Sequence, residues 1–195
     1  MVKQEVLAAL DAVRGRYISG QELAAQLGVS RTAVWKAVAA LRRDGIPIKA
    51  VTNRGYTLAQ SVDVLNAAAV ATQLDEATVK ALQIEVVDRL PGTNAALRSR
   101  ADAGAREGLV LIAQAQSAGR GRGGHSFYSP PGGLYMSILL RPEIGARQAV
   151  GLTAMAAVAA ARAAERLCGV PITIKWVNDL WKNGKKVCGI LTEAA

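Results

Sequence analysis

One segment of the sequence combines four glycines with two arginines: Gly119-Arg120-Gly121-Arg122-Gly123-Gly124. Glycine has no Cβ, so this backbone can turn sharply and approach a ligand closely. The two arginines bring fixed positive charge and planar donor groups that suit a phosphate or a carboxylate. The segment therefore predicts an anion-binding loop.

This loop does not fit a dinucleotide-binding fold, although its glycines match the G-x-G-x-x-G pattern. That fold requires a helix directly after the glycines. Here the chain continues as His125-Ser126-Phe127-Tyr128-Ser129-Pro130-Pro131-Gly132-Gly133, and its prolines and glycines disfavour a helix. A Walker-type P-loop is excluded as well, because no Gly-Lys-Ser/Thr follows.

A flexible surface turn and a Gly/Arg tract that binds nucleic acid remain as alternatives for the loop. However, residues 109–115 and 134–140 are apolar and resemble β-strands, and they enclose the loop on both sides. A loop held between two strands is constrained. This favours the anion site over a disordered tract.

Length and composition are those of a globular protein. A chain of 195 residues suits one or two domains, and 51% hydrophobic residues exclude disorder as the main state. The uncharged run 148–161 is too short for a membrane span, which needs about 20 apolar residues. The N-terminus carries Lys3, Glu5 and Asp11 instead of a signal-peptide core. We expect a cytoplasmic protein with no membrane partner.

The sequence contains few residues that could bind a metal ion or act as reactive thiols. Cys168 and Cys188 are too few and too far apart for a zinc site, and both are expected to be buried thiols. His125 is the one histidine in the sequence, which excludes metal motifs with two histidines. We therefore expect no metal site made by the protein.

The positive charge is concentrated near the N-terminus. The net charge is +9, and residues 1–60 hold nine basic and four acidic residues. This asymmetry predicts a nucleic-acid contact in the first part of the chain.

Residues 1–60 have the pattern of a winged helix-turn-helix domain. Apolar residues at helical spacing predict a first helix over 2–13, and helix caps delimit a second over 21–27 and a third from Ser30 to about Asp44. A hairpin follows, and its turn, Asn53-Arg54-Gly55, presents Arg54 as a basic tip. A helical interaction module whose charges are simply solvated is the alternative.

The third helix separates its faces clearly. At 100° per residue, one stripe is apolar and the opposite face is small and basic, which suits the major groove of duplex DNA. Trp35 lies at the edge and is expected to cover the core. The apolar stripe consists of Val34, Ala37, Val38 and Leu41, and the candidate DNA contacts are Ser30, Arg31, Thr32, Lys36, Arg43 and Arg54.

After a predicted linker over 59–63, helices and strands alternate. We expect helices over 64–74 and 147–167 and one beginning near Ala95, and strands over 82–87, 109–115, 134–140, 172–177 and 187–192. Thr93-Asn94, at a strand-to-helix junction, suits a helix cap better than a ligand contact when taken alone. Lys175, in an apolar strand, needs an anionic partner, either a carboxylate or a ligand.

Four motifs, in their order and spacing, resemble biotin protein ligases: Gln116-Ser117-Ala118-Gly119-Arg120-Gly121-Arg122-Gly123, Ser129-Pro130, Lys175-Trp176-Val177-Asn178-Asp179-Leu180 and Gly189-Ile190-Leu191. The N-terminal helix-turn-helix resembles that of the bifunctional subgroup, which also represses biotin genes. The resemblance covers essentially the whole chain.

The resemblance implies an α+β fold in which the DNA-binding domain precedes a ligase domain over 64–195. The ligase domain would be a mixed sheet flanked by helices, related to class II aminoacyl-tRNA synthetases and lipoate ligases. The implied reaction uses ATP, biotin and Mg²⁺ to make biotinyl-AMP, and then attaches biotin to a lysine of the biotin carboxyl carrier protein of acetyl-CoA carboxylase. Operator DNA is the other implied partner, and a homodimer is left open.

The matching motifs also imply roles for individual residues. Arg122 and Lys175 would be catalytic, because fixed cations relieve the repulsion between a carboxylate and a triphosphate best in the transition state. The nucleotide would contact Arg120, Arg122 and Asn178. Biotin would contact Gly92, Thr93, Asn94, Gln116, Arg120, Gly121, Arg122 and Lys175.

The sequence departs from the family pattern at several positions. Gly92 stands where Ser is frequent, His125 where Arg is common, Phe127 where Trp is usual and Val177 where Pro is usual. The chain also ends at Ala195, before the strands and small barrel that family members carry, so we expect an incomplete ligase domain. Two alternatives stay open: a ligand-sensing transcription regulator without turnover, and a lipoate or octanoate ligase.

Overall fold

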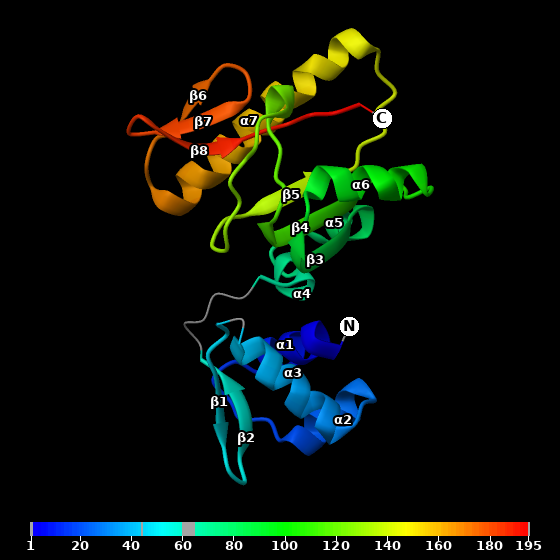
Figure 1. Ribbon diagram of the computed structural model, residues 1–195, viewed down its shortest axis with the longest axis vertical. Coiled ribbons are helices and arrows are strands. Elements are labelled where there is room, and N and C mark those ends of the chain that lie inside the picture. The colour runs from blue at the N-terminus through cyan, green and yellow to red at the C-terminus, as the bar shows by residue number, and fades with distance from the viewer. Residues whose placement is uncertain (1, 44, 60–64, 195) are drawn as a thin grey trace. The chain divides into compact units, whose positions relative to one another are not determined.

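The structure is a computed structural model that describes residues 2–43, 45–59 and 65–194. The chain divides into two compact units, Met1–Val86 and Val87–Ala195, and each is described by itself (Figure 1). The predicted linker over 59–63 and the predicted helix start at Val64 fall almost entirely outside the described residues.

The first unit begins with three helices and a hairpin. The helices are α1 (Val2–Ala12), α2 (Gly20–Leu27) and α3 (Arg31–Arg43), and the hairpin pairs β1 (Ile48–Val51) with β2 (Gly55–Leu58) in antiparallel register. All five elements contribute to one core. Its buried side chains are Val6, Leu7, Ala9, Leu10, Leu23, Ala24, Val34, Ala37, Val38, Leu41, Ile48 and Leu58. The α3 residues among them are those of the predicted apolar stripe.

Local capping explains where the helices of this unit begin and end. Ser19 and Glu22 form a capping box at the start of α2, and Gly28 ends that helix in a left-handed conformation. Ser30 accepts a hydrogen bond from the backbone N–H of Ala33, 3.1 Å away, at the start of α3. The caps expected from the sequence are therefore present.

The hairpin is attached to the segment between α1 and α2. Tyr56 and Ile18 exchange backbone hydrogen bonds of 2.8 and 2.9 Å. Gly55 adopts a φ of 95°, and a Cβ at this position would collide with the backbone of Ile18. The wing is thus fixed to the helices by close backbone approach.

The helix expected over 64–74 is wrong in its extent. The structure has two short helices instead, α4 (Ala67–Ala71) and α5 (Glu76–Ala81). Asp75 explains the second helix, because its carboxylate accepts a hydrogen bond from the backbone N–H of Thr78 at 2.9 Å and caps α5. The Asp75-Glu76 pair was the signal in the sequence for the start of α5. The apolar periodicity does not reveal it, because both residues are polar.

The second unit contains two three-stranded sheets. The first has the order β3-β4-β5, with β3 (Gln83–Leu90), β4 (Leu109–Gln116) and β5 (Tyr135–Ile138), and β4 pairs antiparallel with β5. Helix α6 (Thr93–Asp102) contributes Leu97 to the core that this sheet forms with Leu109 and Leu111. The predicted α+β class is confirmed.

The second sheet packs against the long alanine-rich helix α7 (Ala146–Cys168). Its strands are β6 (Thr173–Lys175), β7 (Asp179–Lys182) and β8 (Lys185–Gly189), all antiparallel (Figure 1). Leu180 is buried against Ala157 and Ala161 of α7. The strand expected over 172–177 is shorter than predicted, because residues 176–178 form a turn that joins β6 to β7.

The cysteines differ from the expectation of two buried thiols. Cys168 is exposed at the end of α7, and Cys188 is partly buried in β8. Burial is the main cause that raises the pKa of the Cys188 thiol. Among the described residues, no helix is both long and apolar enough to span a bilayer.

Candidate functional site

The first part of the candidate site lies at the start of α6. The N-cap of this helix is Gly92, which is extended and offers no side chain, so the expectation that Thr93-Asn94 caps the helix is wrong. Both side chains are instead bonded to other segments of the second unit. The side chains of Thr93 and Asn94 therefore belong to a polar cluster and do not cap the helix.

Gln116, the last residue of β4, connects this cluster to the loop that follows. Its Oε1 accepts hydrogen bonds from the backbone N–H of Thr93 at 2.8 Å and from the Thr93 hydroxyl at 3.2 Å. Its Nε2 donates to Ser129 Oγ at 2.9 Å, and Ser129 Oγ donates to the carbonyl of Phe127 at 2.9 Å. Gln116 thus ties the first turn of α6 to residues 127–129.

Ser137 of β5 completes the cluster, and the sequence analysis missed it. Its hydroxyl lies 2.8 Å from Thr93 Oγ1 and also contacts Asn94 Oδ1. Asn94 Nδ2 in turn donates to Leu191 O at 3.2 Å and to Glu193 Oε2 at 2.8 Å. A signal was present, because Ser137 is a polar residue within the otherwise apolar run 136–140.

The Gly/Arg loop is ordered by its own backbone. The N–H of Phe127 donates to Gly119 O and the N–H of Gly121 to His125 O, both at 2.8 Å, and a short 3-10 turn, η1, spans Arg122–Gly124. A Cβ on Gly119 would lie 2.5 Å from Phe127 O and 2.6 Å from Ser129 Oγ. Glycine at 119 is therefore required by close packing, and the loop is constrained as the flanking strands predicted.

The loop arginines are both exposed. Arg122 is exposed and donates from Nη1 to Asn178 Oδ1 at 3.3 Å, which connects the loop to the turn between β6 and β7. Arg120 is exposed too. Both arginines are available to a ligand.

Lys175 does not occupy the apolar environment expected for it. Its side chain is exposed, and its Nζ lies 5.0 Å from the centroid of the Trp181 ring, within the range of a cation–π contact. Leu180 faces α7, so the neighbouring residues Asp179 and Trp181 face away from it, on the same side of the sheet as Lys175. The sequence left open whether Lys175 pairs with a carboxylate or with a ligand. Among the described residues, Lys175 contacts no carboxylate.

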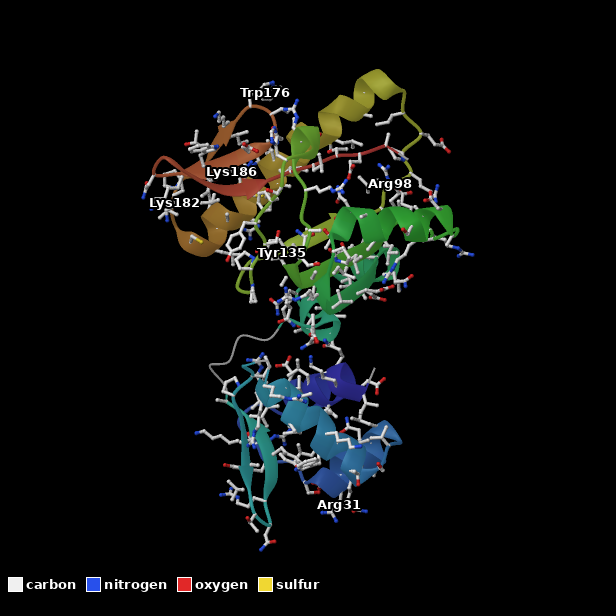
Figure 2. The ribbon with its side chains drawn as sticks, in the orientation of Figure 1. Arg31, Arg98, Tyr135, Trp176, Lys182 and Lys186 are labelled. Carbon is white, nitrogen blue, oxygen red and sulfur yellow. The ribbon has the colours of Figure 1, made fainter. Side chains whose placement is uncertain are left out.

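Two groups of predicted residues are thus brought together. Thr93, Asn94 and Gln116 share one hydrogen-bonded cluster. Gly92 adjoins it, because a Cβ added to Gly92 would lie 3.9 Å from Gln116 Oε1. Arg122 meets Asn178, which also donates from Nδ2 to Asp179 Oδ1 at 3.0 Å. Lys186, labelled in Figure 2, joins this second group by an ion pair with Asp179, and the sequence did not indicate this role for it.

The candidate DNA contacts lie in the first unit. Thr32, Lys36 and Arg43 are exposed on α3, opposite its buried stripe, and Arg31, labelled in Figure 2, is exposed along the edge of that face. Arg54 is exposed in the wing, and its guanidinium lies 4.5 Å from the centroid of the Tyr17 ring. Trp35 is 61% exposed, so the expectation that it covers the core is wrong.

Comparison with known proteins connects these two regions to known families. Residues 84–195 match the model of the Biotin/lipoate A/B protein ligase family, and residues 3–57 match that of an HTH domain. The chain belongs to the biotin/lipoate A/B protein ligase family. The resemblance seen in the sequence motifs is confirmed.

Members of this ligase family are similar to the chain along nearly its whole length. It is 36% identical over 193 residues to the bifunctional ligase/repressor BirA of Bacillus subtilis, covering 98% of this chain and 59% of that protein. It is 35% identical to BirA of Escherichia coli, covering 92% of this chain and 54% of that protein. The chain thus spans little more than half the length of these relatives.

A solved structure gives the same result for the ligase domain. The biotin protein ligase from Aquifex aeolicus, in complex with biotin and ATP, matches 58% of this chain and 47% of its own with a TM-score of 0.51 and 31% identity. The fold of the family is thereby established for this domain.

Proposed function

We propose that this protein is a biotin protein ligase that also binds DNA. In the first step a carboxylate oxygen of biotin attacks the α-phosphorus of ATP, the bond to the β-phosphate breaks, and pyrophosphate leaves. In the second step the neutral amine of a carrier-protein lysine attacks the acyl carbon, AMP leaves, and the nitrogen loses a proton. The contact between Arg122 and Asn178 carries the proposal, because it joins the Gly/Arg loop to the segment that bears Lys175.

The cluster at the start of α6 is the proposed biotin site. Gly92, Thr93, Asn94 and Gln116 would surround the ring and tail of biotin, with Ser129 and Ser137 holding the polar groups in place. A site built to hydrogen-bond a ligand rejects analogues that leave its polar groups unpaired. This supports discrimination between biotin and a lipoyl chain, which lacks the ring amides.

The loop arginines and Lys175 are the proposed sites for the reacting anions. Arg120, Gly121 and Arg122 would cover biotin and the phosphates, Asn178 would contact the nucleotide, and Lys175 would approach the carboxylate and the α-phosphate. Charge develops on the phosphate oxygens during the displacement, and fixed cations nearby stabilise it without reorganisation. The exposure of Arg120, Arg122 and Lys175 supports this use of their charge.

We assign Mg²⁺ to the nucleotide substrate. Within the described part of the chain, no cluster of three or more His, Cys, Asp or Glu side chains could hold a metal ion. Mg²⁺ usually binds through few protein carboxylates together with substrate phosphates and water. We therefore treat MgATP as one substrate.

The first unit would bind operator DNA through α3 and the wing. Lys36 and Arg43 lie on the α3 face opposite its buried stripe, where they can reach phosphates while the helix enters a major groove. Arg54, held over Tyr17, would contact an adjacent phosphate. The biotin carboxyl carrier protein of acetyl-CoA carboxylase is the proposed protein substrate, and repression of biotin genes the proposed use of DNA binding.

The test is to incubate the protein with MgATP and biotin and to detect biotinyl-AMP by mass spectrometry. We expect the adduct with biotin, none without ATP, and much less of the corresponding adduct when lipoate replaces biotin. Binding of biotin without any adduct would support a ligand-sensing regulator instead. Equal or greater adduct formation with lipoate would support a lipoate ligase.

A further inference from the structure

One face of the sheet β6-β7-β8 carries an aspartate between two lysines. Asp179 lies directly opposite Lys175 on β6 and directly opposite Gly189 on β8. Residues directly opposite in an antiparallel pair have Cβ atoms about 4.5–5.5 Å apart, and opposite charges at such positions attract each other. Lys175 and Asp179 are thus placed to form an ion pair.

The carboxylate of Asp179 is nevertheless used by a different lysine. Lys186 Nζ lies 2.7 Å from Asp179 Oδ1, and Asn178 Nδ2 donates to the same oxygen at 3.0 Å. Within the described ranges Lys175 makes no ion pair, and its Nζ lies over the Trp181 ring. Two donors therefore hold Asp179 while the lysine opposite it keeps its charge unneutralised.

Gly189 makes room for this arrangement. A Cβ on Gly189 would lie 3.0 Å from Cε and 3.1 Å from Nζ of Lys186, which is closer than ordinary van der Waals contact. The absence of a side chain lets the lysine cross the strand toward Asp179. Lys186 also lies near the segment that follows the Gly/Arg loop, with its Nζ 5.8 Å from the centroid of the Phe127 ring.

We propose that Lys186 is a positioning residue that keeps Asp179 from pairing with Lys175. The proposal rests on the proposed function, in which the free ammonium of Lys175 meets the reacting anions. If Lys186 is removed, the carboxylate of Asp179 is left to the lysine directly opposite it, Lys175. An ion pair would then hold the Lys175 ammonium at the sheet and reduce its interaction with the carboxylate and phosphate.

The reactivity of the Lys175 amine tests this without any substrate. An ion pair stabilises the charged ammonium, so less of the neutral amine is present and its acylation at a fixed pH is slower. The rate at Lys175 is measured by brief treatment with labelled acetic anhydride at pH 8 and peptide mass spectrometry. In Lys186→Met we expect acylation of Lys175 to fall by about two- to fivefold, the range for a partly exposed ion pair.

A double variant, Asp179→Asn with Lys186→Met, distinguishes pairing of Lys175 with Asp179 from a general effect of losing a positive charge. Asp179→Asn keeps an oxygen that accepts from Asn178 but cannot form the ion pair, so adding Lys186→Met should then change the rate much less. Lys185→Met is the matched control, since it removes an exposed lysine from the same strand one residue away. We expect Lys185→Met to leave the reactivity of Lys175 unchanged.

Two results would overturn the proposal. One is an unchanged Lys175 rate in Lys186→Met, and the other is an equal decrease whether or not the chain also carries Asp179→Asn. Melting temperatures of all variants are compared, because an exposed lysine should alter them little. Single-turnover formation of biotinyl-AMP is then followed in the same set, where the rate should fall with the Lys175 reactivity. Absence of any biotinyl-AMP would refute the proposed function, whereas the acylation rates still decide the role of Lys186.

Discussion

At the scale of single residues, Gln116 is the side chain that joins most of the candidate biotin site. Its acceptor oxygen holds the first turn of α6 through Thr93, and its amide nitrogen holds Ser129. A ligand that used Gln116 would find an amide whose position is already fixed from both sides. Preorganisation of this kind lowers the entropic cost of binding.

Replacing Gln116 by Ala should weaken both biotin binding and the fold. Losing one neutral hydrogen bond costs about 0.5–1.5 kcal/mol, which predicts a drop in biotin affinity of roughly two- to tenfold by calorimetry. Ser129 is only 3% exposed and serves as the control, because it supports Gln116 from the side away from Thr93. We expect a smaller loss of affinity in Ser129→Ala. Biotin affinity unchanged by Gln116→Ala would place Gln116 outside the pocket.

Arg122→Ala and Lys175→Met should slow adenylation without unfolding the protein. Both side chains are exposed, so their removal should change the melting temperature little. A charge contact made mainly in the transition state is worth about 10²–10³ in rate, by analogy with a lost oxyanion donor. The measurements are single-turnover formation of biotinyl-AMP and thermal melting of each variant. A loss of melting temperature in proportion to the loss of rate would contradict the catalytic roles.

The residue types in the site could be predicted, but their contacts could not. Gln116 and Arg122 were singled out by the Gly/Arg segment and the family motif, and the structure joins each to a further candidate residue. Ser137 and Lys186 were missed, because their partners lie 44 and 7 positions away in the sequence. Trp35 was misjudged, because periodicity gives its angle on the helix but not how much neighbouring segments cover it.

At the scale of elements, Gly119 and Gly121 of the Gly/Arg loop differ in the space around them. Gly119 packs against the backbone of Phe127, whereas the atom nearest to a Cβ on Gly121 would be His125 O at 3.7 Å, an ordinary contact. The two positions lie in the same loop and differ in this respect. They form a matched pair for testing how the loop is built.

Gly119→Ala should destabilise the second unit, and Gly121→Ala should not. Overpacking against atoms that cannot move freely costs about 1–3 kcal/mol, and for a domain of about 100 residues each kcal/mol shifts the melting temperature by about 4–8 °C. Thermal melting followed by circular dichroism measures both variants. Equal melting temperatures for the two would show that the packing around Gly119 relaxes without cost.

The capping box of α2 should make the first unit sensitive to acid. The backbone N–H of Ser19 donates to the Glu22 carboxylate at 2.8 Å and is the main cause that holds the pKa of Glu22 below its ordinary value. A carboxyl with a lowered folded-state pKa stabilises the fold above its unfolded pKa, and this stability is lost as pH falls through the folded value.

Glu22→Gln keeps the acceptor oxygen but not the charge. We therefore expect the variant to melt below the parent at pH 7 and by a smaller difference at pH 3. A gap in melting temperature that is equal at the two pH values would refute this. The measurement is thermal melting of both proteins at each pH.

Most elements could be predicted, and the exceptions have physical reasons. The ends of α2, the cap at Ser30 and the stripe on α3 are local signals and were identified. The Thr93-Asn94 pair was misassigned as a cap, because the backbone N–H of Thr93 at the start of α6 bonds to Gln116, the last residue of β4. The turn between β6 and β7 was missed since the apolar run 172–177 continues through it.

At the scale of the whole molecule, two units with separate cores carry the two candidate sites. The core of the helix-turn-helix is made by residues between Val6 and Leu58, and the ligase cores by residues beyond Val87. Each candidate site is built from residues of one unit only. Substitutions on the surface of one unit should therefore leave the chemistry of the other intact.

The DNA-binding face offers the clearest test of this separation. Lys36 and Arg43 are exposed on the α3 face opposite its buried stripe, and neither has a role in the proposed ligase site. Reversing both charges with Lys36→Glu and Arg43→Glu should weaken binding to duplex DNA. It should also flatten the dependence of log affinity on log salt by about 0.9 for each lost phosphate contact, because fewer counterions are released.

The measurement is fluorescence anisotropy with a labelled duplex at several salt concentrations, together with the rate of biotinyl-AMP formation. Lys80→Glu is the control, because it also reverses a positive charge. Lys80 is exposed on α5, outside the helix-turn-helix core. We expect the Lys36 and Arg43 double variant to lose DNA affinity and to keep its adenylation rate. An unchanged salt slope in that variant would mean that this face of α3 does not contact DNA, since the loss of two phosphate contacts must lower the slope whatever the sequence of the duplex.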